Sequence, residues 1–212
     1  MEKKKNDFIA QGSILAIASI LVRVMGMIYR IPMTAIIGDK GNGFYSYAYS
    51  VYTILLLLSS YSLPLAVSKM VSAKAQLGQW RNVKRVFICA IAFAIGIGTT
   101  FGLIVLIGAQ FFTRVFFHSE LAAIALRFMA PTILIMALLG VFRGFFQGLQ
   151  NTLPTAVSQI VEGLINAIMS VVFAYFLFDF GHGMDAAGGT TDLGYAWGAA
   201  GGAIGTGAGA LA

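Results

Sequence analysis

The sequence predicts an all-α membrane protein, a polytopic bundle of about six transmembrane helices. Long apolar runs, few charges, and basic residues gathered mainly between the runs all predict it. Of 212 residues, 58% are hydrophobic and only 10% are charged, whereas a soluble domain carries about 25% charged residues. The runs reach about 20 residues, which crosses the hydrocarbon core of a bilayer at 1.5 Å per helical residue. This pattern excludes a soluble protein with one large core.

Six apolar segments are the predicted spans, and together they form one transmembrane lobe. They cover residues 14–37, 44–67, 86–112, 121–142, 154–178 and 195–212. The connections between them are a glycine-rich turn (38–43), a basic stretch (68–85), a short loop that holds Arg114, His118 and Glu120, and residues 143–153 and 179–194. The last span is still apolar at Ala212, so we expect a truncated product or a fragment of a longer transporter.

Basic residues are distributed unevenly between alternating connections. One set of connections, which includes the N-terminal tail, holds Lys3, Lys4, Lys5, Lys69, Lys74, Arg81, Lys84, Arg85 and Arg143. The other set holds Lys40 and Arg114, together with Asp39, Glu120, Asp179, Asp185 and Asp192. Cytoplasmic connections carry an excess of lysine and arginine. The N-terminus is therefore predicted on the cytoplasmic side.

Arginines inside the predicted spans are candidates for function, because a charge in lipid is costly. Arg23 and Arg30 lie seven residues apart in the first span and so share one helix face. Planar guanidinium groups suit phosphate, so we expect this face to bind a phosphate or pyrophosphate headgroup. The structural alternative is pairing with acids or lipid headgroups, with Arg30 reaching outward. Arg127 in the fourth span is a third candidate for substrate binding.

A polar line runs along the fifth predicted span, where Gln159, Glu162 and Asn166 recur at helical spacing. Glu162 and Arg23 each lie eight or nine residues into a span that starts on the cytoplasmic side, so they are expected at similar depth. A direct Arg23–Glu162 ion pair is one hypothesis, either static or broken when a cation arrives. Gln159, Glu162 and Asn166 are thus the candidates for an ion pair or for coupling to H+ or Na+.

Aromatic residues open the second predicted span, namely Phe44, Tyr45, Tyr47, Tyr49 and Tyr52. Such a cluster is typical of a belt at the membrane interface. In the alternative interpretation, Tyr45, Tyr49 and Tyr52 share one face, line a cavity and stack against sugar, which makes Tyr49 a substrate-binding candidate. Pro64 is expected to bend the inner end of this span.

The remaining motifs do not indicate catalysis. The sixth span is rich in glycine, which indicates close helix packing rather than a nucleotide loop, because no strand precedes it. His118 and His182 lack metal-ligand spacing, and Cys89 is interpreted as a small buried apolar residue. We therefore expect no enzymatic activity, no cofactor, no metal and no nucleic acid partner.

Several runs of residues resemble a known family. The stretch RGFFQGLQNTLPTAVSQIVE, from Arg143 to Glu162, is similar to the junction of spans four and five in the polysaccharide-transporter and SpoVB-like branch of the MOP flippase superfamily. LPLAVSK, which ends at Lys69, and GDKGNGFY, which begins at Gly38, resemble the same branch. RVMG, which begins at Arg23, is similar to the first-helix signature of MurJ-type lipid II flippases.

The resemblance implies two helical lobes around a central cavity with alternating access and about fourteen spans. The chain would be most of the N-terminal lobe, with the C-terminal lobe as a missing partner. The implied cargo is an undecaprenyl-linked sugar precursor, either lipid II or a polysaccharide unit, moved outward across the bacterial inner membrane. Arg23 matches the first arginine of the MurJ-type signature, whereas the second arginine of that signature sits one residue earlier than Arg30.

A flippase is the leading expectation, because an anionic headgroup needs a wide cationic path while its polyprenyl tail stays in lipid. A cation-coupled multidrug antiporter of the same superfamily is one alternative. It would favour acidic cavity residues, whereas the candidates here are three arginines, Arg23, Arg30 and Arg127, and one glutamate, Glu162. A non-transporting membrane scaffold of envelope assembly is the other alternative.

Overall fold

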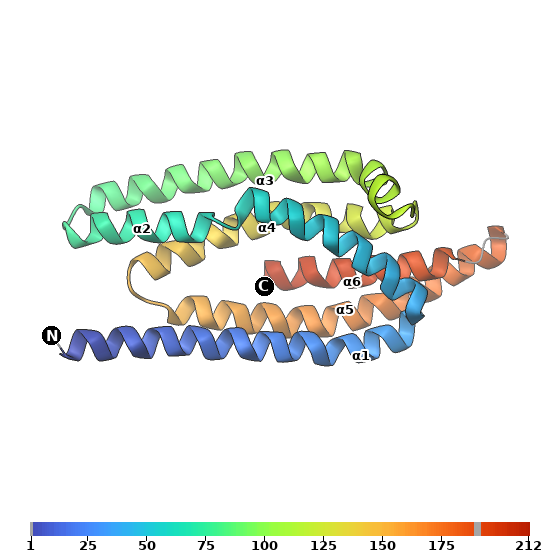
Figure 1. Ribbon diagram of the computed structural model, residues 1–212, viewed down its shortest axis with the longest axis horizontal. Coiled ribbons are helices and arrows are strands. Elements are labelled where there is room, and N and C mark those ends of the chain that lie inside the picture. Colours follow the sequence, from blue (N-terminus) through green and yellow to red (C-terminus); the bar gives the residue numbers. More distant parts are fainter. Residues whose placement is uncertain (1, 189–191) are drawn as a thin grey trace.

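The protein, seen in a computed structural model, is a bundle of six helices (Figure 1). The structure describes the backbone of residues 2–188 and 192–212, and the side chains of residues 12–186 and 192–212. The helices are α1 (Glu2–Ser60), α2 (Leu63–Gln76), α3 (Trp80–Phe117), α4 (Ala122–Gly148), α5 (Leu153–Gly188) and α6 (Leu193–Leu211). This confirms the all-α fold class. The three lysines of the N-terminal tail lie outside the described side chains.

The first two predicted spans form one element, α1, which reverses direction at Gly38. Gly38 has φ 63° and ψ −178°, a left-handed backbone conformation that glycine adopts without steric cost. The reversal lies right of centre in Figure 1, where the blue first segment of α1 passes into the part that crosses the bundle. The predicted turn of residues 38–43 is therefore wrong in length, because the helix resumes at Asp39.

A second break separates α1 from α2 at residues 61–62. Pro64 occupies the first turn of α2, where its missing N–H leaves no helical hydrogen bond unmade. The sequence-based prediction of a bend near Pro64 is confirmed. The Ser60 hydroxyl at this break is buried and lies 2.9 Å from the hydroxyl of Ser59.

Helices α3, α4 and α5 run past the ends of their predicted spans. A helix satisfies its own backbone hydrogen bonds in lipid and in water alike, so polar residues at its end do not stop it. The connection predicted at 143–153 shrinks to residues 149–152, and most of the one predicted at 179–194 is helical. At the end of α5, the Asp185 carboxylate accepts hydrogen bonds from the N–H groups of Leu193 (3.1 Å) and Gly194 (2.8 Å), which caps α6.

Four segments of the described chain are long and apolar enough to cross a membrane. They are Gly12–Gln76, Trp80–Phe117, Ala122–Gly148 and Leu153–Ala186. The first contains two predicted spans, folded back at Gly38. Helix α6 is not among the four, because its many glycines lower its hydropathy; most of its residues are buried. A sixth crossing stays a prediction, and the chain is a multi-pass membrane protein.

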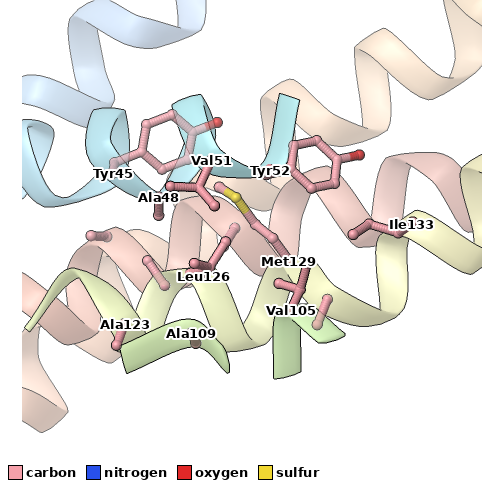
Figure 2. Close-up of a cluster of buried hydrophobic side chains, with 14 of the residues drawn as sticks. Tyr45, Ala48, Val51, Tyr52, Val105, Ala109, Ala123, Leu126, Met129 and Ile133 are labelled. Atoms are coloured by element: carbon pink, nitrogen blue, oxygen red, sulfur yellow. The ribbon is translucent and has the colours of Figure 1, made fainter. Parts of the chain in front are cut away.

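The helices form two groups (Figure 1), which are joined by the second half of α1 and by direct packing of α4 on α6. Helices α2, α3 and α4 pack together, and α5 and α6 pack with the first half of α1. Figure 2 shows the buried cluster at the crossing, where Tyr45 and Tyr52 of α1 lie near Leu126 and Met129 of α4 and Val105 of α3. This crossing holds the second half of α1 in a fixed place beside α4.

Glycines let two pairs of helices approach backbone to backbone. On α6, a Cβ added at Gly201, Gly205 or Gly209 would overlap backbone atoms of α5. This confirms the predicted small-residue packing of the last span. On α4, Gly144 lies against the backbone of Pro64 in the same way, with 2.5 Å between its ideal Cβ and the Pro64 carbonyl oxygen. Sequence analysis did not single out this second contact.

Candidate functional site

Arg143 of α4 and Glu162 of α5 form an ion pair between two helices. The Arg143 Nη2 group donates to Oε2 of Glu162 at 2.6 Å, and the two side chains are 14% and 25% exposed. Arg143 Nε also donates to the Ser158 hydroxyl at 3.0 Å, and that hydroxyl donates to the Thr155 carbonyl at 2.9 Å. These contacts fix the Arg143 side chain to α5. Because a guanidinium carries five N–H groups, Arg143 has further donors beyond these two.

The short connection between α4 and α5 explains this pairing. Gln150 adopts a left-handed conformation with φ 59°, which turns the chain back within residues 149–152. The end of α4 and the start of α5 are thereby brought together, so Arg143, five residues before the end of α4, meets Glu162, nine residues after the start of α5. Both residues lie within segments apolar enough to cross a membrane.

A crevice of about 230 Å³ opens beside Arg143. Its walls come from the break between α1 and α2, from α4 and from α5, and its polar groups belong to Ser60, Tyr61, Arg143, Gln147 and Gln159. The Oε1 atom of Gln159 is buried and has no hydrogen-bond partner among the described residues. The crevice therefore combines a fixed cation with hydrogen-bonding groups that the protein leaves partly unused.

Asn166 has a different environment from Gln159 and Glu162. Its Oδ1 atom accepts a hydrogen bond from the Ser170 hydroxyl at 2.8 Å, and that hydroxyl also lies 3.2 Å from the Gly202 carbonyl oxygen. Asn166 thus belongs to the contact between α5 and α6. Of the three predicted residues on α5, Gln159 lines the crevice and Glu162 holds the arginine that lines it.

The predicted Arg23–Glu162 ion pair is wrong, because Arg143 pairs with the carboxylate. Arg23, Arg30 and Arg127 are exposed, and none of them forms an ion pair or hydrogen bond within the described residues. Their role in substrate binding stays a prediction. Sequence analysis missed Arg143 as a site residue because it ends an apolar run and resembles a cytoplasmic flank. The available signal was an isolated acid, Glu162, that needs a nearby cation.

The tyrosines of α1 form a stack along one helix face. Ring centroids of Tyr45 and Tyr49 lie 5.8 Å apart, and those of Tyr49 and Tyr52 lie 5.9 Å apart. Tyr45 and Tyr52 are 1% and 3% exposed, so the interpretation as an interfacial belt is wrong for these two. Tyr49 is 39% exposed and is the member of the stack open to a ligand. At helical spacing the same face continues to Leu56 and Ser60, which line the crevice.

Two further predicted features can be compared with the structure. Cys89, interpreted as buried, is exposed on α3. Within the side chains that the structure describes, no three His, Cys, Asp or Glu residues lie close enough together to hold a metal ion.

A family model described as "Polysaccharide biosynthesis protein" matches residues 8–210, which is nearly the whole chain. The chain belongs to this family. The match confirms the resemblance to the polysaccharide-transporter and SpoVB-like branch of the MOP flippase superfamily.

Three relatives of this polysaccharide biosynthesis family member come from Bacillus subtilis (strain 168). The chain is 27% identical to lipid II flippase MurJ over 163 residues. This alignment covers 73% of the chain and 30% of MurJ. It is 26% identical to stage V sporulation protein B over 184 residues, an alignment that covers 87% of the chain and 36% of that protein. It is 26% identical to the uncharacterized membrane protein YabM over 185 residues, an alignment that covers 87% of the chain and 34% of that protein. The chain thus spans about a third of the length of these relatives. No solved structure matches the chain significantly.

Proposed function

We propose that this chain is one helical lobe of a flippase for undecaprenyl-pyrophosphate-linked sugar precursors, either lipid II or polysaccharide units, in the bacterial cell membrane. Membership of the polysaccharide biosynthesis family supports the proposal, as does similarity to a relative named a lipid II flippase. The observation that carries it is Arg143, a cation fixed within an apolar helical segment beside a crevice that has polar groups on a largely apolar wall. A charge is kept at such a place when it serves a polar or anionic cargo.

The arginines differ in whether an acidic residue balances their charge. Glu162 balances the charge of Arg143, so this guanidinium is stable within the bundle. Arg23 and Arg30 have no acidic partner in the described chain, so their charge is free to bind the phosphate oxygens of a headgroup. Large apolar side chains such as Ile31 and Ile107 are 72% and 80% exposed, as contact with lipid and a polyprenyl tail requires.

The proposal includes the orientation and the parts needed for a transport cycle. We place the N-terminus in the cytoplasm, because removing Arg143 from the cytoplasmic set still leaves that set strongly basic. A second, C-terminal lobe completes the cavity. Coupling to H+ or Na+ acts at Glu162, since a proton or cation that reaches this carboxylate competes with Arg143 for it.

Replacing Arg23 with alanine is expected to weaken binding of undecaprenyl pyrophosphate about tenfold, because a charge-assisted contact to phosphate is lost. The affinity is measured on the chain in lipid nanodiscs by native mass spectrometry or thermophoresis. Arg114→Ala is the control, since Arg114 is 73% exposed and pairs loosely with Glu120 at 3.5 Å. Native affinity in Arg23→Ala would remove Arg23 from the site. Binding of cationic drugs in place of the lipid would favour an antiporter, and binding of neither would favour a scaffold.

A further inference from the structure

We infer that the crevice between the α1–α2 break, α4 and α5 is a subsite for a single sugar ring. The inference rests on the proposed function and adds to it the place where the sugar, as opposed to the pyrophosphate, is bound. It follows from the size of the crevice, from the hydrogen-bonding groups it leaves unused, and from the aromatic ring at its rim.

The size of the crevice favours one ring. Its volume of about 230 Å³ is below the roughly 300 Å³ at which pockets for drug-sized ligands begin. It is also several times larger than the ~30 Å³ that one water molecule occupies in the liquid. The crevice holds one ring, so further rings of an oligosaccharide would lie outside it, and a single structural water does not fill the space.

The chemistry of the walls distinguishes a sugar from other occupants. Gln159 Oε1 is a buried acceptor that needs a donor, whereas the free N–H groups of Arg143 need acceptors. A hydroxyl group can donate to the first and accept from the second. Phosphate oxygens only accept, and a polyprenyl tail does neither. Since Glu162 already balances the guanidinium charge, the crevice favours a neutral polar ligand over an anion.

The position of the crevice also suits a sugar. Tyr61 lines the crevice and is 76% exposed, so its ring is available to lie against the C–H face of a sugar ring. Ser60, the preceding residue, also lines the crevice, and its buried hydroxyl lies 2.9 Å from that of Ser59. Gly140 of α4 adds no side chain, which keeps the crevice open next to Pro64.

Gln159→Met tests the inference, because methionine has a similar length and lacks the amide. Two probes are compared with the chain in nanodiscs: undecaprenyl pyrophosphate, and the same lipid carrying one hexose. The variant is expected to bind the sugar-bearing lipid about fivefold more weakly, the effect of one lost hydrogen bond, and the bare lipid with native affinity. Its thermal midpoint should equal or exceed that of the native chain, since a buried acceptor without a partner is removed.

Asn42→Leu is the matched control, since Asn42 Oδ1 is a buried acceptor without a partner in the described chain and Asn42 does not line the crevice. This variant should bind both lipids as the native chain does. Gln147→Met repeats the test from α4 if Gln159→Met fails to fold. Equal affinity of the native chain for the two lipids, or equal losses for both in Gln159→Met, would overturn the sugar subsite and leave the flippase proposal standing. Failure of the native chain to bind either lipid would overturn the proposed function itself.

Discussion

Glu162→Leu is expected to destabilise the folded bundle by about 2–4 kcal/mol, because it leaves the Arg143 guanidinium without a carboxylate inside a span. Removing one partner of a fully buried pair costs about 3–5 kcal/mol. The lower range applies here because Glu162 is 25% exposed and Ser158 still accepts a hydrogen bond from Arg143. The change is measured as the midpoint of thermal or SDS-induced unfolding in detergent, followed by size-exclusion chromatography.

A double variant separates the pair from its individual residues. In Arg143→Met with Glu162→Leu no unpaired charge remains, so most of the lost stability should return. Glu120→Leu is the control, because its partner Arg114 lies 3.5 Å away in an exposed pair and the effect should stay within about 0.5 kcal/mol. If the losses of the two single variants simply add in the double variant, the ion pair contributes nothing of its own.

The Arg143–Glu162 pair also shows where inference from the sequence reached its limit. Hydrophobic runs indicated the long apolar helices, because bilayer thickness sets the length of such runs. Their ends were placed too early, since an arginine after an apolar run resembles a flank in water. Only the turn at Gln150 and the rotation of α5 show that Arg143 meets an acid and stays inside the bundle. Neither feature follows from local periodicity.

The candidate site could be predicted in part. Helical spacing correctly put Tyr45, Tyr49 and Tyr52 on one face, but burial of two of them depends on the crossing with α4, which spacing does not determine. The free-energy cost of a charge in lipid indicated Glu162 as a functional candidate, and helical spacing added Gln159 on the same helix face. The crevice beside them needs three helices and a chain break in one place, so no single stretch of sequence predicts it.

Gly205→Leu is expected to prevent α6 from packing against α5. A Cβ at Gly205 would overlap the backbone N and Cα and the hydroxyl of Ser170, and a helix backbone cannot move aside as a flexible side chain can. Overpacking of a core costs typically about 1–3 kcal/mol, and contact with backbone puts this variant at the top of that range or above it. The loss is measured as the fraction of protein that elutes as a single monodisperse peak, and as the unfolding midpoint of that fraction.

Gly96→Leu is the matched control on α3, because an added Cβ at Gly96 meets no atom within 4 Å. The same substitution there should leave the elution profile unchanged and raise stability slightly, since glycine within a helix costs about 0.5–1 kcal/mol relative to alanine. The contrast isolates packing from helix propensity, because both glycines are helical and only Gly205 touches a neighbouring backbone. A native elution profile and midpoint in Gly205→Leu would show that α6 does not rest on α5. The contact that holds Asn166 and Ser170 in place would then be absent as well.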